Sequence, residues 1–494
     1  MDEAITQQCD LTRLLDAQAE WLIVRENGTS FPLQAGEIEV SSARGLIRLG
    51  FVDDRGFHSF PIHGWSENGD ELAIRIGRDF GKTPEIIRLV PRTSAAALAM
   101  HVEIARTERA GEIGSAIARA YPHLKLFRVA LSTDNGRLVE IIFENTSGGR
   151  IGVLSDVTES LTAECMLVSG MRWIDRLRVR SKKPYRELWL AGPKKQARPL
   201  QKLCGLLRSS EQNGLSILLL DLNKDDACRE LKMLKPSDLW REKPKKLLLP
   251  GSVTITETAK NVIAVASENI DVINSKQGET IRFHGLPFVR VRTMLGREKA
   301  WLGFDRSRRP ITEDNRGELS DLIRSLEDYR RADGPNRRHR LYSHSPEAWL
   351  ESILRRNIKL LDPNLILAPI YNQFRASSDK IDLLALRRDR RLVIIELKTS
   401  PDREMVFQSA DYWRKIEMQR RRGNLAKAKV FGDLEILDVP ALVYAVAPAL
   451  SFHRDFEYFA RKLAPEIELW RFELHENWRR KIKVIGRKNY NFHS

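Results

Sequence analysis

The sequence predicts a multidomain protein built from β and α/β parts, with an α/β domain at its C-terminal end. Three observations lead to this fold class. The chain has 494 residues, a length that suits two to four domains at roughly 100–200 residues each. The spacing of apolar residues changes several times along the chain. A polar, basic and proline-bounded stretch, "DGPNRRHRLYSHSP", precedes the last part of the sequence.

These changes divide the chain into five segments. Residues 1–98 contain short alternating runs separated by Gly, Asn and Asp, which predict a β-rich module. Residues 99–240 alternate between helical and strand patterns, which predicts a layered α/β segment. Residues 241–332 contain short strand-like runs, among them "SVTITET" and "NVIAVAS", and end in an amphipathic helix. We expect residues 333–346 to form a linker and residues 347–494 to form the second α/β domain.

The composition favours a globular protein with a polyanionic partner. The apolar and charged contents, 42% and 30%, exclude a largely disordered chain. The formal net charge of +16 favours nucleic acid through counterion release, with a generally basic surface as the alternative. The four cysteines form no CxxC pair, which argues against a zinc finger and fits a reducing compartment. With neither a signal-like start nor a long apolar run, we expect a cytoplasmic protein that does not enter membranes.

The stretch "KIDLLALRRDRRLVIIELKTS", residues 380–400, predicts a hairpin with charges in unusual places. Asp382 begins the first strand, and Glu396 and Lys398 lie in the second. Because strand residues two apart share a face, Glu396 and Lys398 lie on the same side. Asp382 is expected beside Glu396, since the two belong to adjacent strands. Buried unpaired charges are costly, so these groups must pair with each other, bind something or line a cleft.

Two predicted helices frame this hairpin. "SPEAWLESILRRNI" begins with Ser345 as an N-cap and carries Glu347 and Glu351 on one face, either of which could serve a site. "MVFQSADYWRKIEMQRRR" follows the hairpin and stacks Gln408, Tyr412 and Lys415. With the strands "LILAPIYNQF" and "PALVYAVAP", the predicted order is α-β-β-β-α-β.

This order of residues resembles the PD-(D/E)xK, or restriction-endonuclease-like, nuclease superfamily. The resemblance rests on Glu351, Asp382, Glu396-Leu397-Lys398 and the QxxxY motif from Gln408 to Tyr412, and it covers roughly residues 345–450. It is nearest to mismatch- and single-strand-cleaving endonucleases and to RecB-like nuclease domains. Lys380 and Ile381 stand where the family name suggests a proline. Residues 99–240 are considered as a degenerate copy of the same fold, although they lack a comparable ExK.

The resemblance implies a Mg²⁺-dependent nuclease, with Mn²⁺ as a substitute. The metal ligands would be Asp382, Glu396, the Leu397 carbonyl and Glu351, and Lys398 would orient water or stabilise the charged phosphate. Gln408 and Tyr412 would brace the site or touch the DNA backbone.

Several alternatives stay open. Each of the charged residues could also have a purely structural role, such as a plain ion pair between Glu396 and Lys398. For His453 a structural role is favoured. The basic helix end predicts phosphate contacts through Lys415, Arg420, Arg421 and Arg422. DNA is favoured over RNA as the partner, in repair or in defence. The rival interpretation is a nucleic-acid-binding protein with weak or lost catalysis, and a homodimer is one option for an undetermined oligomeric state.

Overall fold

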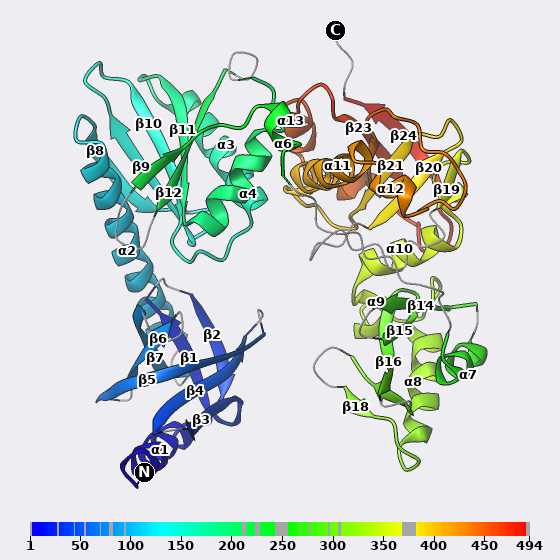
Figure 1. Cartoon of the computed structure of the whole chain (residues 1–494), viewed down its shortest axis with the longest axis horizontal. Helices are drawn as coiled ribbons and strands as arrows, with labels where there is room; N and C mark the ends of the chain where they lie inside the picture. Colours follow the sequence, from blue (N-terminus) through cyan, green and yellow to red (C-terminus); the bar gives the residue numbers. More distant parts are fainter. Residues whose placement is uncertain are drawn as a thin grey trace. The chain divides into compact units, whose positions relative to one another are not determined.

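The protein is described here by a computed structural model (Figure 1). It describes residues 2–26, 29–43, 45–53, 56–69, 71–78, 83–92, 95–209, 214–222, 228–242, 255–266, 268–275, 278–294, 297–304, 308–367 and 382–490. The chain forms two compact units, Met1–Gln201 with Gly214–Met233, and Lys202–Asn213 with Leu234–Ser494. Four sheets with accompanying helices confirm the predicted multidomain combination of β and α/β parts. No helix in the described part of the chain is both long and apolar enough to cross a membrane.

The first unit begins with a seven-stranded antiparallel sheet in the order β2-β1-β7-β6-β5-β4-β3. Its core consists of the inward-facing residues of these strands and two leucines of the first helix, Leu11 and Leu15. Alternation of apolar and polar residues produces this one-sided burial, as in β6, where every second residue is buried over most of its length. The elements are α1 (Asp2–Asp16), β1 (Glu20–Arg25), β2 (Ser30–Gln34), β3 (Ile38–Ala43), β4 (Leu46–Asp53), β5 (Gly56–Asn68), β6 (Glu71–Arg78) and β7 (Thr83–Pro91).

The rest of the first unit is a six-stranded mixed sheet in the order β13-β12-β11-β10-β9-β8. The strands β10, β11 and β12 are parallel, and β8, β9 and β13 complete the sheet in antiparallel pairs. The elements are α2 (Ala95–Ala120), β8 (Lys125–Leu131), β9 (Leu138–Glu144), β10 (Arg150–Asp156), α3 (Ala163–Arg180), β11 (Tyr185–Gly192), α4 (Lys194–Cys204), β12 (Ser216–Leu222) and β13 (Cys228–Leu231).

The second unit contains a five-stranded antiparallel sheet and flanking helices. Its strands run in sequence order, β14 (Ile270–Ser275), β15 (Gly278–Phe283), β16 (Leu286–Met294), β17 (Arg297–Leu302) and β18 (Arg309–Pro310), with α6 (Pro236–Leu239), α7 (Glu257–Val265) and α8 (Arg316–Tyr329) as helices. Helix α7 replaces the strands expected within residues 252–267. The Thr256 side chain caps this helix by accepting from the Ala259 N–H, and Glu279 on β15 holds Thr256 in turn.

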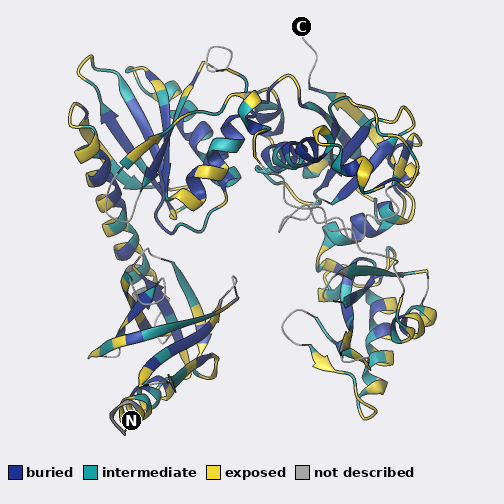
Figure 2. Ribbon diagram, viewed as in Figure 1, coloured by how far each residue is buried: buried dark blue, intermediate teal, exposed yellow. Residues whose placement is uncertain are grey.

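The last sheet has six strands in the order β19-β20-β21-β22-β23-β24. It comprises β19 (Leu365–Leu367), β20 (Leu383–Arg387), β21 (Leu392–Leu397), β22 (Leu442–Pro448), β23 (Glu468–Leu474) and β24 (Val484–Asn489), with α10 (Pro346–Arg356), α11 (Met405–Arg421), α12 (Asn424–Lys427) and α13 (Phe456–Ala460). Strands β21 and β22 are buried along their whole length, and Figure 2 shows the centre of this sheet and much of α11 as buried. A continuous apolar run is what a parallel strand covered on both faces requires. The predicted strand "LILAPIYNQF" extends past β19 into residues 368–381, which lie outside the described residues.

The segment 333–346 is packed rather than a linker, which corrects the expectation from its polar sequence. It contains the short helix α9 (Arg340–Ser343), whose Tyr342 is buried. The reason is Arg330, a fully buried guanidinium that donates 2.7 Å hydrogen bonds to the carbonyls of Leu341 and His344. A buried guanidinium must satisfy its N–H groups, so it holds this segment in place.

The turn between β15 and β16 packs closely against the start of α10. Gly285 in this turn has φ +78°, and a Cβ added there would lie 1.9 Å from the Ala348 carbonyl oxygen. Only glycine fits such a position without moving the backbone of one partner. The turn therefore fixes the N-terminal end of α10 against the five-stranded sheet.

Candidate active site

The predicted hairpin forms, and it brings Asp382 to Glu396. Strands β20 and β21 pair antiparallel, with Leu383 opposite Ile395, so Asp382 just before β20 lies level with Glu396. Asp382 Oδ2 also accepts a 2.9 Å hydrogen bond from the backbone N–H of Leu397. The first acidic side chain is thereby fixed to the end of the strand that carries the second.

Glu396 is the most unusual group in this region. It is only 3% exposed, although it lies near the end of a strand. Its Oε1 lies 3.3 Å from Lys398 Nζ, whereas its Oε2 has no hydrogen-bond partner among the described residues. Burial and the neighbouring carboxylates of Asp382 and Glu347 raise the pKa of Glu396 well above its ordinary value, against the lowering effect of Lys398. Binding a cation or a proton would therefore stabilise this buried carboxyl group.

Lys398 links Glu396 to a further carboxylate, Asp402. Its Nζ lies 3.0 Å from Asp402 Oδ2 as well as 3.3 Å from Glu396 Oε1. Burial by itself lowers the pKa of Lys398, but the carboxylates of Glu396, Asp402 and Glu347 outweigh burial and the net pKa is raised. The ammonium is therefore charged at neutral pH and held by two anchors. Sequence analysis missed Asp402, because residues 398–402 lie in a loop, where a spacing of four residues does not predict a contact.

The two acids of α10 have different neighbours. Glu351, the predicted metal ligand, is 2% exposed and lies 3.6 Å from both Arg282 of β15 and Arg355 of its own helix. Arg282 is also paired with Asp271, at 2.6 Å. Glu347, by contrast, is the α10 carboxylate whose charge acts on both Glu396 and Lys398. The structure thus places Glu351 in an ion-pair cluster with Arg282 and Arg355, whereas Glu347 is the acid of α10 whose charge acts on Glu396 and Lys398.

Helix α11 presents the predicted QxxxY residues on one face. The Gln408 Oε1 atom is buried and has no hydrogen-bond partner in the described part of the chain. Lys415 lies with its Nζ 5.5 Å from the centre of the Tyr412 ring and 2.6 Å from Asp411 Oδ2. Lys415 is therefore held by residues of its own helix. Gln408 Oε1 is, after Glu396 Oε2, a second buried acceptor without a hydrogen bond from the described residues.

The basic end of α11 is engaged by protein groups, and the phosphate contacts expected there stay predictions. Arg420 pairs with the fully buried Glu417 at 2.7 Å and also with Asp438. Glu417 in turn accepts from the Ala441 N–H at 2.8 Å.

The next two arginines contact the segment before α7. The Arg421 guanidinium stacks on the Trp240 ring at 4.3 Å, and Arg422 donates to the carbonyls of Trp240 and Glu242. All three arginines, Arg420, Arg421 and Arg422, thus contact other parts of the chain.

His453 has a structural environment, in line with the expectation for it. Its Nδ1 accepts a 3.1 Å hydrogen bond from the Asp455 N–H and lies 3.8 Å from the Asp455 carboxylate. Burial lowers its pKa, with Arg403 and Arg454 adding to this effect and Asp455 opposing it. Asp455 also lies 3.5 Å from Arg403. The imidazole ring of His453 therefore stabilises the turn between His453 and Asp455.

In the described ranges, no three His, Cys, Asp or Glu side chains gather closely enough to hold a metal ion by themselves. The hairpin offers two carboxylates, those of Asp382 and Glu396. Mg²⁺ characteristically binds one or two carboxylates and keeps several waters. Two carboxylates and a backbone carbonyl at Leu397 therefore suit that ion, and do not suit a metal that demands a full set of side-chain ligands.

The comparisons with known proteins give little beyond this geometry. No protein-family model matches the chain, and no curated protein matches it. Among solved structures, the chain is similar to EndoMS in its apo form, with 13% identity, a TM-score of 0.16, and coverage of 43% of this chain and 93% of that one. It is similar to an EndoMS–dsDNA complex at 14% identity, TM-score 0.15, covering 42% and 86%. A repair endonuclease from Pyrococcus abyssi gives 14% identity, TM-score 0.16, and coverage of 45% and 96%.

Proposed function

We propose that this protein is a metal-dependent nuclease, acting on DNA, with its catalytic centre at the Asp382–Glu396–Lys398 hairpin. The order α10, β19, β20, β21, α11, β22 supports a restriction-endonuclease-like domain. In this arrangement, two carboxylates and a lysine from adjacent strand ends meet beside a polar helix face. The net charge of +16 supports a polyanionic substrate.

The observation that carries the proposal is the unpaired oxygen of Glu396. An ionised carboxylate that is buried and only half paired costs several kcal/mol. A sequence selected only for stability would place an apolar residue here, as the rest of β21 does. A divalent cation at Glu396 Oε2 would remove this cost, with Asp382 and the Leu397 carbonyl as its other protein ligands. When bound, Mg²⁺ supplies Lewis-acid activation of the phosphate and a more acidic water.

The side chains around this position have distinct tasks in the proposed reaction. Lys398, charged and fixed by Asp402, stabilises the negative charge that develops on the phosphate oxygens. Glu347 orients water from the α10 side, in the role first assigned to Glu351. Gln408 positions water or the DNA backbone through its unused Oε1. The reaction adds water oxygen to phosphorus, breaks one bridging P–O bond and leaves a phosphomonoester and a hydroxyl group.

A second candidate is a nucleic-acid-binding protein without catalysis. The raised pKa of Glu396 favours it, because a protonated Glu396 would be a neutral and stable core residue without any metal. The two candidates differ in whether a divalent cation binds at the hairpin.

The test is a cleavage assay on duplex, mismatched, branched and single-stranded DNA and on RNA, with Mg²⁺, Mn²⁺ or EDTA. We expect cleavage of DNA with either metal and none in EDTA. Asp433→Asn, which removes an exposed carboxylate of the same domain, is the matched control for Asp382→Asn. Cleavage that persists in EDTA, or that Asp382→Asn leaves intact, would contradict the proposal.

A further inference from the structure

The two six-stranded sheets have the same topology, strand for strand. In each, the first three strands are antiparallel, the third, fourth and fifth are parallel, and the sixth is antiparallel. Helices also enter at the same points: α2 and α10 precede the sheets, α3 and α11 follow the third strands, and α4 and α13 follow the fourth. Such agreement in order, direction and connections indicates two copies of one fold in a single chain.

The strand registers identify the equivalent positions. In the C-terminal copy, Glu396 near the end of β21 lies level with Asp382, just before β20. In the central copy, Asp156 at the end of β10 lies opposite Leu138, the first residue of β9. The sequences "VIIELK" and "VLSDVT" then align without a gap, so Thr158 stands where Lys398 stands. The central copy retains one acid of the three charged residues.

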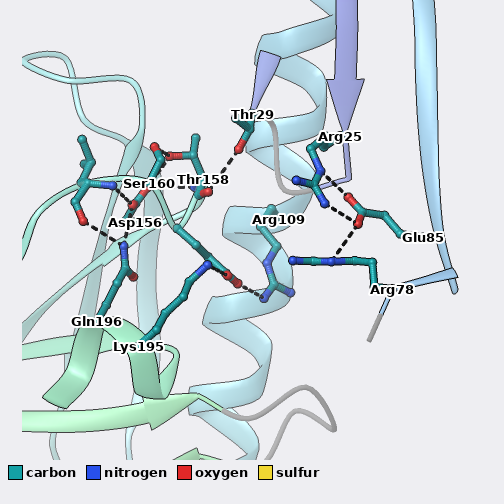
Figure 3. Close-up of polar contacts among 12 residues, drawn as sticks. Arg25, Thr29, Arg78, Glu85, Arg109, Asp156, Thr158, Ser160, Lys195 and Gln196 are labelled. Atoms are coloured by element: carbon teal, nitrogen blue, oxygen red, sulfur yellow. Dashed lines mark hydrogen bonds and ion pairs between the residues drawn. The ribbon is translucent and has the colours of Figure 1, made fainter. Parts of the chain in front are cut away.

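The carboxylate of that acid, Asp156, is saturated with hydrogen bonds from neighbouring groups. Asp156 Oδ1 accepts hydrogen bonds from the N–H and the hydroxyl of Thr158, at 2.8 and 2.7 Å. Its Oδ2 accepts from the Leu161 N–H at 2.7 Å and from Gln196 Nε2 at 2.8 Å (Figure 3). Each oxygen thus accepts two hydrogen bonds, which uses all the lone pairs of the carboxylate. Glu396, by comparison, has one oxygen that accepts no hydrogen bond from any described residue.

The charge around Asp156 is also opposite to that around Glu396. In the central copy, Arg106 of α2 is the helix residue that acts electrostatically on Asp156. Burial, with the nearby Arg137, lowers the pKa of Arg106, and Asp156 opposes this lowering. In the C-terminal copy the corresponding helix supplies Glu347. Arg106, a cation on the helix that corresponds to the one carrying Glu347, would disfavour a divalent cation at Asp156.

The loop after β10 is braced from several sides. The Thr158 carbonyl accepts a 3.1 Å hydrogen bond from Thr29 of the seven-stranded module. The next residue, Glu159, pairs with Lys195 of α4 at 2.9 Å and lies 3.9 Å from Arg109 of α2 (Figure 3). Thr158 and Asp156 are both at most 2% exposed. Burial alone does not distinguish Asp156 from Glu396, which is 3% exposed, but the oxygens of Asp156 already accept four hydrogen bonds and have none left for a metal ion.

We propose that each chain holds one cutting centre and one non-cutting copy of the same fold, so that a single chain breaks one DNA strand per binding event and produces nicks. This inference rests on the proposed function of the C-terminal copy. In each event one water is consumed and one P–O bond is broken, while the opposite strand stays intact. Cleavage of both strands then needs two chains on one duplex.

The test follows a supercoiled plasmid carrying the preferred substrate, with the full-length protein and Mg²⁺, at protein concentrations far below that of the plasmid. We expect nicked circles to form at a rate proportional to protein concentration. Linear DNA should appear later, or rise with the square of that concentration. Linear DNA formed together with nicked circles, at a rate proportional to protein concentration, would overturn the inference while leaving the nuclease proposal intact. No cleavage at all would overturn both.

The nicking rates of variants in each copy show which copy cuts DNA. Lys398→Ala removes the C-terminal centre and should lower nicking by about 10²-fold or more. Residual cutting of one strand that Asp156→Asn then removes would show that the central copy also cuts, and would overturn the inference. Because Asp156→Asn disturbs a buried hydrogen-bond network, Thr158→Ala provides a milder second variant. It should lower the melting temperature and leave the nicking rate within about twofold, whereas a large loss of nicking in a folded Thr158→Ala protein would contradict a non-cutting copy.

Discussion

Lys398 Nζ lies 3.3 Å from one carboxylate oxygen of Glu396, and the other oxygen of Glu396 has no partner among the described residues. A simple ion pair in a protein interior would use both oxygens or would be solvated at its free side. In this pair the described residues bond only one of the two oxygens, and the second is buried. The predictions below separate a catalytic use of this arrangement from a structural one.

Replacing Glu396 by Gln should abolish cleavage and leave DNA affinity within about threefold. The amide keeps the shape of the side chain but cannot bind Mg²⁺ as a carboxylate does. The melting temperature should not fall in the absence of metal, because the change removes a buried and strongly perturbed acid. Cleavage rate, DNA binding and thermal unfolding are to be measured beside Asp433→Asn. A Glu396→Gln protein that cuts at the wild-type rate would exclude this residue from the metal site.

Lys398→Ala should lower kcat by about 10²–10³-fold with KM little changed, because a charge that acts in the transition state affects turnover more than binding. The variant should also lose some stability, since Glu396 and Asp402 lose their common partner. Lys429→Ala, which removes an exposed lysine of the same domain, is the control. If Lys398→Ala lowers only the melting temperature while kcat is kept, the ion pair is purely structural.

The stabilising effect of Mg²⁺ should increase with pH. The folded-state pKa of Glu396 is raised above 4.5, so the folded form binds the proton more tightly than the unfolded chain does. Without metal, stability is therefore lost as pH rises from the unfolded pKa through the folded one. Bound Mg²⁺ needs the ionised acid and offsets this loss at the higher pH values. The melting temperature with and without Mg²⁺ at pH 5 and pH 8 measures the effect, which should disappear in Glu396→Gln.

The two acids of α10 should give opposite results. Glu347→Gln should slow cleavage by about tenfold or more with little change in stability, since the residue is half-buried and acts on the hairpin by its charge. Glu351→Ala should cost about 3 kcal/mol of stability, because it leaves Arg282 and Arg355 buried without this partner. Cleavage per folded molecule should be kept in Glu351→Ala. The reverse pattern would restore Glu351 as the metal ligand.

Arg420→Ala should lower stability and leave the salt dependence of DNA binding unchanged. Its side chain is 7% exposed and is paired with the fully buried Glu417. Loss of a phosphate contact would instead flatten the slope of log K against log salt by about one unit. Binding titrations at several salt concentrations, together with chemical unfolding, distinguish the two. A flatter slope with unchanged stability would show that Arg420 contacts DNA.

The hairpin and α11 could be predicted from sequence because their signals are local. Strand alternation places Glu396 and Lys398 on one face, and helical spacing stacks Gln408 on Tyr412. The choice between Glu347 and Glu351 could not be made in this way. Both lie on the same helix, and the partner that decides is Arg282 on a distant strand.

At two other places the structure differs from the sequence prediction, and the cause is again a contact with a distant part of the fold. The basic end of α11 has the composition of a phosphate-binding surface, but Trp240 and Asp438, remote in sequence, take up its charges. Residues 252–267 are rich in β-branched residues, yet a threonine cap held by Glu279 makes part of this segment a helix. In both cases a tertiary contact outweighs a local preference.

The close fit of Gly285 against Ala348 has a consequence for how this half of the protein can be divided. Helix α10 is held by the five-stranded sheet through this contact, through Arg282 and through the segment that Arg330 fixes. The same helix carries Glu347 to the hairpin. A fragment cut at the polar stretch before α10 would lose all three supports and leave Glu351 without its Arg282 partner. The five-stranded sheet and the hairpin domain are therefore expected to unfold together, in a single cooperative transition.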